Sequence, residues 1–138
     1  MPAVIDHAAP ARLITTPPHE AKQISTRLRY DPVDPLAVQV AFAAEASLDG
    51  AEVVWVFARE LLNAGLSGPA GKGDVRLWPC ASGRTVVAFE APEGVAVVEF
   101  DTPDVRRFLA HSYAAVPRER EEHGLRLEAG LAALLGGV

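Results

Sequence analysis

The spacing of apolar residues along this chain changes period near residue 101. Upstream, apolar residues alternate with other residues along 36–42, and a period of two is typical of a β-strand that buries one face. Downstream, Thr102-Pro103 supplies an N-cap hydroxyl and a proline at the first helical position. The residues that follow at helical spacing are Val105, Phe108, Leu109 and Ser112. Strands followed by helices favour the α+β class, an antiparallel sheet packed with helices.

Turn-forming residues divide the chain into further elements. We expect strands at 36–42, 53–57, 74–78, 85–90 and 95–100, and helices at 58–64, from 102 to the Val116-Pro117 stop, and from 125 onward. Asp49-Gly50 is typical of a tight hairpin turn, and Gly65 is typical of the residue that follows a helix. Pro79 is expected to end its strand, because proline cannot donate to the ladder.

The length of 138 residues fits one domain, since domains most often have roughly 100–150 residues. Residues 1–23 carry several prolines and little periodicity, so we expect a loosely structured arm with a possible short strand at 11–16. Residues 24–138 then form the domain. The N-terminus lacks the basic and apolar regions of a signal peptide, and no apolar run is long enough for a membrane span. We therefore expect a cytoplasmic protein without direct membrane insertion.

The balance of charge argues against nucleic acid as a partner. The net charge is −5, whereas a nucleic-acid binder gains most of its affinity from basic residues facing phosphates. Basic and acidic residues are also mixed, as in the linker 118–124. This pattern indicates a solvated surface of mixed charge.

The motifs of common enzymes and metal proteins are not recognisable. Cys80 is the one cysteine, which excludes an intrachain disulfide and favours a small buried apolar residue. The segment 65–73 has the wrong spacing for a phosphate-binding loop and is followed by an expected strand where a helix should begin. The four histidines are far apart in sequence: His7, His19, His111 and His123. We expect no catalytic residue, no metal and no cofactor.

Several residues of the middle segment are better explained by structure than by a ligand. Trp55, Phe57, Leu61 and Leu62 are expected to join a strand face and a helix face in one apolar cluster. Arg59 and Asp74 are candidates for an ion pair that fixes the helix against the next strand.

Three segments in order resemble one family. They are LRYDPVDPLAVQVAF at 28–42, WVFARELLNAGL at 55–66 and GKGDVRLWP at 71–79. Together they resemble the core of the SsgA-like regulators of sporulation-specific cell division in actinomycetes. The supporting order of APEGVAVVEF at 91–100 and AAVP at 114–117 is similar too.

The resemblance implies a protein that binds other proteins and catalyses no reaction. It implies a whirly-like fold with a curved antiparallel sheet, assembly as a homotrimer, and a place at the division septum. The implied partners are FtsZ and SsgA-like paralogues. The alternative is a whirly-like protein that binds single-stranded nucleic acid. Aromatic side chains on an exposed sheet face beside arginines favour that alternative, whereas aromatic side chains in the core oppose it.

The C-terminal segment supplies a candidate interaction site. Its expected helix carries an apolar stripe made of Leu127, Leu131, Leu134 and Leu135. A helix of this length is marginal alone in water, so its stripe must be buried against another surface. That surface is its own sheet, another subunit or a partner, and we expect another subunit or a partner.

Overall fold

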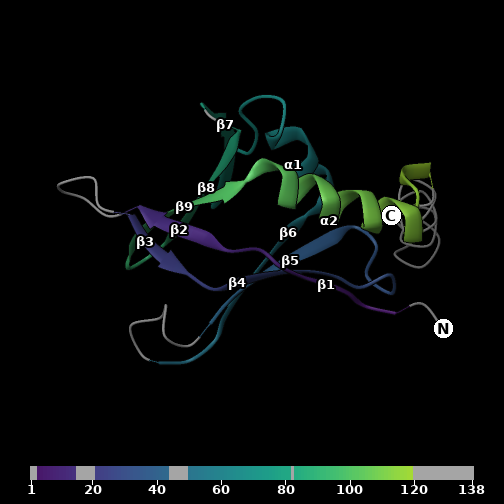
Figure 1. The fold of residues 1–138 in the computed structure, drawn as a ribbon, viewed down its shortest axis with the longest axis horizontal. Coiled ribbons are helices and arrows are strands. Elements are labelled where there is room, and N and C mark those ends of the chain that lie inside the picture. Colours follow the sequence, from purple (N-terminus) through teal and green to yellow (C-terminus); the bar gives the residue numbers. More distant parts are fainter. Residues whose placement is uncertain (1–2, 15–20, 44–49, 82, 120–138) are drawn as a thin grey trace, which may run out of the picture.

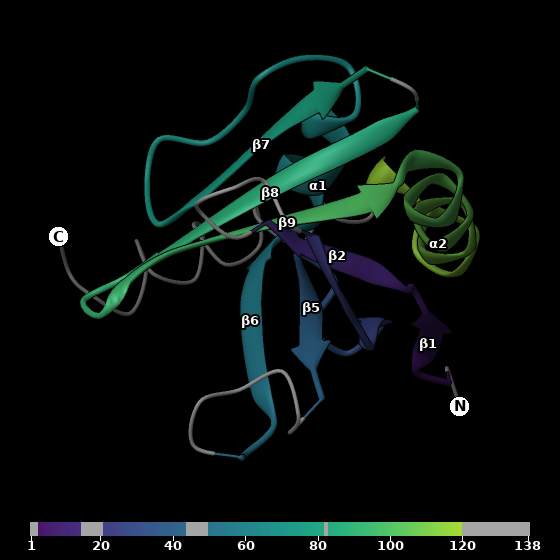
Figure 2. The same cartoon turned by 60° about the vertical axis from the view of Figure 1, so that its left-hand side comes forward.

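The computed structural model describes residues 3–14, 21–43, 50–81 and 83–119 of the chain. Within these ranges nine strands form two antiparallel sheets, and two helices lie together on one side of the molecule (Figure 1). The α+β class is therefore confirmed. The strands are divided between two sheets. In the second view, the strands of one sheet run across the direction of those of the other (Figure 2).

Sheet A contains four strands in the order β1-β4-β5-β6. Their bounds are Ile5–Ala8 for β1, Thr26–Tyr30 for β4, Ala37–Phe42 for β5 and Val53–Ala58 for β6. The strands expected at 36–42 and 53–57 are thus confirmed, and Val38 lies opposite Phe57 in their ladder. The connection between them runs from residue 43 to 52, so the expected tight hairpin at Asp49-Gly50 is wrong. Gly50 does adopt the positive φ expected of it, 72°.

Sheet B contains five strands in the order β3-β2-β9-β8-β7. Their bounds are Ala11–Ile14 for β2, Ala21–Ile24 for β3, Val75–Cys80 for β7, Arg84–Ala91 for β8 and Gly94–Asp101 for β9. The three expected strands are confirmed. Pro79, however, lies inside β7 opposite Thr85 and does not end it. An edge strand tolerates proline where the missing N–H would have faced away from the sheet.

The expected loose arm is wrong in the part of 1–23 that the structure describes. β1 pairs with β4, and β2 lies between β3 and β9 within sheet B. Ala9 and Ala11 are buried, and Ala11 lies opposite Phe100. Strands of four residues are too short to show a clear period, and their partners lie far along the chain.

Helix α2 spans Thr102–Ala115 and buries the predicted face of Val105, Phe108, Leu109 and Ser112. Thr102 does not cap the helix with its side chain: its hydroxyl lies 2.8 Å from the hydroxyl of Thr85. The helix ends before Val116-Pro117, as expected. Helix α2 packs against β1 and β9, whereas α1, which spans Arg59–Gly65, packs against β7 and β6.

Gly65 has a different role from the one expected. It is the last residue of α1, and a Cβ at this position would lie 2.5 Å from the Cβ of Leu77 on β7. The absent side chain therefore lets α1 approach sheet B closely.

The apolar core lies between the two sheets and under the helices. Phe57 and Leu62 are buried in it, and Trp55 and Leu61 pack against it, which confirms the expected cluster. The Phe89 ring is at its centre, 5.1 Å from the ring of Trp55 and 6.3 Å from that of Phe57. These contacts hold β6 of sheet A against β8 of sheet B.

Arg59 is completely buried, and the expected ion pair with Asp74 is not how its guanidinium is held. Its Nη1 donates to the carbonyl oxygens of Ser112 and Val116 at 3.0 and 2.8 Å. The guanidinium also lies over the rings of Tyr30 and Tyr113, 4.7 and 4.2 Å from their centroids. Arg59 thereby joins the start of α1 to the end of α2.

Candidate protein-interaction surface

Strand β6 forms one edge of sheet A, and no described residue pairs with its outer side. Its six residues include no charged side chain and no proline. Val53, Val54 and Val56 expose 37%, 42% and 56% of their surface. A valine-rich strand with a free edge is a template for pairing with another chain.

The other three sheet edges carry features that discourage such pairing. β1 has four residues and includes Asp6 and His7. β3 has four residues and exposes Lys22, and β7 contains Arg76 and Pro79. Charges, prolines and short lengths are the usual means by which proteins protect sheet edges. Among the four edge strands that the structure describes, β6 alone lacks them.

Alternate residues of β6 direct their backbone groups to the free edge. Just beyond the strand, the Arg59 N–H donates to the Leu36 carbonyl at 2.8 Å. Antiparallel pairs alternate between bonded and non-bonded positions, so this bond sets the pattern for the ladder with β5. It assigns the odd-numbered residues of β6 to the bonds with β5. The N–H and C=O groups of Val54 and Val56 consequently point away from β5, whereas Ala58 is the N-cap of α1 and its C=O belongs to the first turn of that helix.

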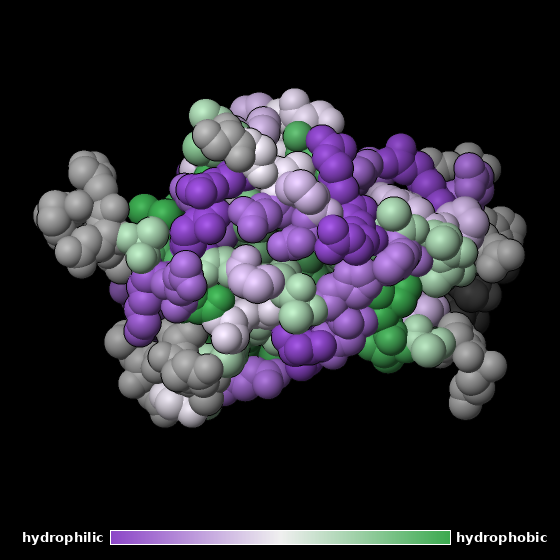
Figure 3. Space-filling model, in the orientation of Figure 1, coloured by the Kyte–Doolittle hydropathy of each residue, from purple (hydrophilic) through white to green (hydrophobic). Residues whose placement is uncertain are grey.

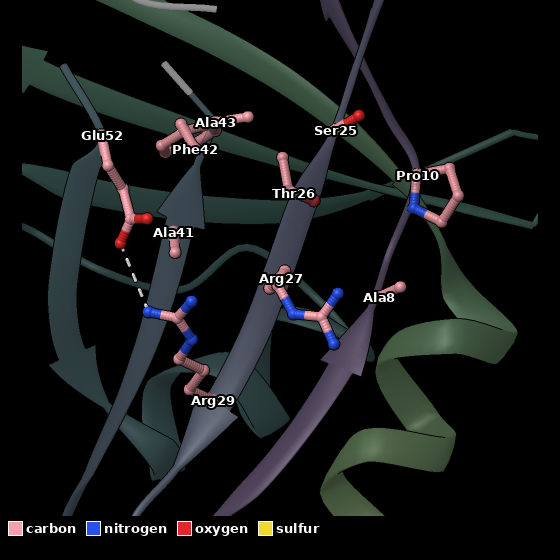
Figure 4. A pocket seen from close by; sticks show the side chains of 10 residues that line it. All are labelled: Ala8, Pro10, Ser25, Thr26, Arg27, Arg29, Ala41, Phe42, Ala43 and Glu52. Carbon is pink, nitrogen blue, oxygen red and sulfur yellow. Dashed lines mark hydrogen bonds and ion pairs between the residues drawn. The ribbon is translucent and has the colours of Figure 1, made fainter.

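The outer face of sheet A beside β6 has small side chains and paired charges. Figure 4 shows Arg27 and Arg29 leaving β4 on the same face, with Ala41 on β5 beside them. Arg27 Nε lies 2.6 Å from Asp6 Oδ1, and Arg29 Nη1 lies 3.4 Å from Glu52 Oε1. A hollow of about 290 Å³ lies over this face. Because each arginine has a carboxylate partner, the hollow is not an open anion site.

A second hollow, of about 160 Å³, lies on the inner side of β6 between the two sheets. We call it the inner hollow. Its lining is entirely apolar and consists of Leu13, Ile24, Phe42, Val53, Trp55, Phe89, Ala96 and Val98. Val53 and Trp55 belong to β6 itself, so the inner hollow adjoins the strand that has the free edge.

The face that carries α2 has a different character. Hydrophilic side chains predominate there, and hydrophobic ones form small separate patches (Figure 3). His7 Nε2 on β1 lies 2.8 Å from His111 Nδ1 on α2, a contact that sequence spacing does not reveal. Burial lowers the pKa of His7, and the nearby His111 and Arg107 lower it further. The carboxylates of Asp6 and Asp104 act on this pKa in the opposite direction.

The described residues offer little for chemistry. Among them, no group of three or more His, Cys, Asp or Glu side chains is placed to hold a metal ion. Cys80 is exposed at the end of β7 and is not the buried apolar residue expected from sequence. In the same part of the chain, neither helix has the length and apolar character needed to cross a membrane.

The structure does not place the interaction site that the sequence predicts. Leu127, Leu131, Leu134 and Leu135 all lie outside the described residues. The exposed edge of β6 was missed for a different reason. The run from Val53 to Phe57 is apolar on both faces, which indicates a strand but does not say which face is covered. That β6 is an edge strand follows only from the order of strands in sheet A, which this run does not show.

The chain matches known proteins in sequence and in structure. The sequence model of a family described as Streptomyces sporulation and cell division protein, SsgA, matches residues 24–121. The chain belongs to the SsgA family. One relative in this family is the sporulation-specific cell division protein SsgB of Salinispora tropica. It is 42% identical over 139 residues, which cover 99% of this chain and 96% of the relative.

Other members of the SsgA family agree in sequence and in structure. SsgB of Streptomyces coelicolor is 42% identical over 113 residues, 78% of this chain and 79% of that protein. The crystal structure of an SsgA-like sporulation-specific cell division protein from Thermobifida fusca has a TM-score of 0.77 at 31% identity and covers 94% of each chain. A solved chain from work on SsgB mutations that correlate to longitudinal cell division in Streptomyces coelicolor has a TM-score of 0.78 at 35% identity. It covers 88% of this chain and 94% of that chain.

Proposed function

We propose that this protein is a non-enzymatic regulator of sporulation-specific cell division. In this proposal it is cytoplasmic, localises to septum sites, and recruits or positions division machinery such as FtsZ through protein–protein contacts. Membership of the SsgA family and the division role in its relatives' names support the process. The uncharged edge of β6, with which no described residue pairs, is the observation that supports the mode of action.

The surface beside β6 suits contact with a protein better than catalysis. It combines exposed valines, an apolar hollow and a free backbone edge, and these are features of peptide and protein recognition. The charges beside it pair with one another, as Arg29 does with Glu52.

Binding of single-stranded nucleic acid is the second candidate, and the described residues favour it less. Phe57, Phe89 and Phe100 are buried in the core, away from the face that carries Arg27. Trp78 is half-buried on the outer face of sheet B, but base stacking along a strand needs successive aromatic platforms. Most described arginines also pair with carboxylates: Arg12, Arg27, Arg29, Arg76, Arg84, Arg107 and Arg118. Such pairing leaves little positive charge for phosphates.

Assembly is part of the proposal. We infer a homotrimer that also contacts SsgA-like paralogues, with the C-terminal leucine stripe as one contact surface. Leu131→Asp, in the middle of that stripe, is then expected to reduce the mass measured by light scattering while circular dichroism stays unchanged. A mutant that unfolds, or one that keeps the full assembled mass, would remove the stripe from the proposed contacts.

Imaging tests the proposed function. A fluorescently tagged copy and tagged FtsZ are followed together in sporulating hyphae of the native host. The expected result is a ladder of this protein at future septa, with FtsZ at the same sites. A diffuse signal in hyphae that septate normally, or normal septation after deletion of the gene, would count against the proposal.

A further inference from the structure

We propose that β6 binds a short extended segment of a partner protein, which joins sheet A as an additional strand. The segment places a large apolar side chain in the inner hollow defined above. This inference rests on the proposed function, because it takes protein contact as the protein's mode of action. It goes further by naming the surface, the backbone conformation of the partner and the side chain that is selected.

The backbone of β6 is the first support. Val54 and Val56 direct their N–H and C=O groups to an edge that no described residue occupies. An extended segment antiparallel or parallel to β6 satisfies these groups, as in other cases of strand addition. A docked helix does not, because its backbone groups bond within the helix.

The two faces of β6 decide which side chains fit. Successive residues of an added strand alternate between the outer face and the inner face of sheet A. Side chains of the added strand that point to the inner face lie next to Val53 and Trp55, which line the inner hollow. The lining there is wholly apolar, so a leucine, methionine or phenylalanine fits and a charged residue is rejected. On the outer side they lie next to Val54 and Val56, where small β-branched residues suit the face.

The size of the edge favours a short segment over a second copy of this chain. Six residues of strand extend over about 20 Å, and a neighbouring strand lies about 4.8 Å away. The area buried along such an edge is a few hundred Å², roughly half or less of the ~800 Å² per partner found in stable complexes. An edge of this size suits a reversible contact with a linear segment, as recruitment requires.

The probe for the experiment is a fluorescein-labelled heptapeptide, Lys-Val-Thr-Leu-Thr-Val-Lys, which alternates apolar and polar residues about a central leucine. Binding to the full chain is followed by fluorescence anisotropy. We expect a Kd below about 1 mM, and at least about tenfold weaker binding when the central leucine is replaced by aspartate. Two further peptides are N-methylated at alternate residues, so that each one loses the N–H groups along one edge of the peptide strand. Strand addition predicts that one form binds and the other does not.

Matched variants of the protein test the two parts of the surface. Val56→Pro removes an N–H at the free edge and leaves the bonds to β5 in place, so we expect at least about tenfold weaker binding. Ala96→Phe fills the inner hollow and is expected to abolish the preference for leucine over aspartate. The control is Val95→Thr, at an exposed valine on β9 that does not line the inner hollow, and its binding should be unchanged.

Several results would overturn the inference. They are no binding of the leucine peptide, equal binding of the leucine and aspartate peptides, or equal binding of the two N-methylated forms. A Val56→Pro protein that is folded but has lost its assembled mass would assign the edge to a second copy, which also contradicts the inference. If Val56→Pro does not fold, the N-methylated peptides on the unmodified protein still decide the matter. Septal localisation in hyphae is measured separately, so the proposed function can stand when this inference fails.

Discussion

Replacing Arg59 with methionine removes the buried cation that joins the two helices and keeps a side chain of similar length. Two hydrogen bonds are lost, to the carbonyls of Ser112 and Val116. A bond from a charged donor contributes about 1.5–3 kcal/mol. The stacking on Tyr30 and Tyr113 adds about 1 kcal/mol or more. Relief from burying a charge offsets part of the loss.

We therefore expect Arg59→Met to lower the free energy of unfolding by about 3 kcal/mol, because the Val116 carbonyl is left without this donor. For a domain of this size that corresponds to about 12 °C in the melting temperature. Urea unfolding followed by circular dichroism measures the loss. Arg106→Met is the control: Arg106 is exposed on α2, and its loss should change stability by less than about 0.5 kcal/mol.

The comparison of the two variants decides whether Arg59 joins the helices. If Arg59→Met matched Arg106→Met within about 0.5 kcal/mol, the hydrogen bonds to α2 would contribute nothing net and the reasoning would be refuted. The free energy of unfolding of Arg59→Lys should lie between those of Arg59→Met and Arg106→Met. It retains the charge but lacks the planar group that stacks between two rings and donates in a fixed direction.

Three further predictions concern smaller features. Gly65→Ala should destabilise the protein by more than 1 kcal/mol in thermal unfolding, about the cost of overpacking, because the new Cβ meets Leu77; an unchanged melting temperature would contradict this. The pKa of His7 is lowered from 6.5, so its contribution to stability is present above pH 6.5 and decreases as the pH falls below that value. His7→Gln should therefore make the free energy of unfolding depend less on pH in this range. An unaltered dependence on pH would contradict this prediction. Cys80→Ser should change stability by less than about 0.5 kcal/mol, because the thiol is exposed; a larger loss would indicate an unrecognised contact.

Much of the fold follows from sequence periodicity. The strands β5, β6, β8 and β9 and the buried face of α2 are all predicted, because each has an apolar run or a periodic pattern long enough to indicate its type. Among the four-residue strands, β2 corresponds to the short strand expected at 11–16, whereas β1 and β3 are not predicted, since short segments near prolines show no period. Their place depends on distant partners, as Ala11 opposite Phe100 illustrates.

Contacts between distant residues account for the other differences. Arg59 is predicted as half of an exposed ion pair because arginine is rarely buried, but the fold encloses it between two tyrosines. His7 and His111 are far apart in the chain and meet only because β1 packs on α2. Neither contact can be predicted from local sequence spacing.

The candidate surface shows the same limit. Sequence reasoning locates a valine-rich strand at 53–57 and interprets it as part of the core. Only the order of strands reveals that β6 is outermost and that Val54 and Val56 are exposed. Burial depends on what lies beside a strand, which is a property of the whole fold.

The most direct test of the account is a count of FtsZ ladders in sporulating hyphae whose one copy of the gene is either unmodified or Val56→Pro. Both proteins are expressed at equal levels, and Val95→Thr serves as the surface control. If the protein acts through the free edge of β6, hyphae with Val56→Pro should contain folded protein but few FtsZ ladders, and the control should match the unmodified strain. Ladders of normal number and spacing with a folded Val56→Pro protein would contradict the account.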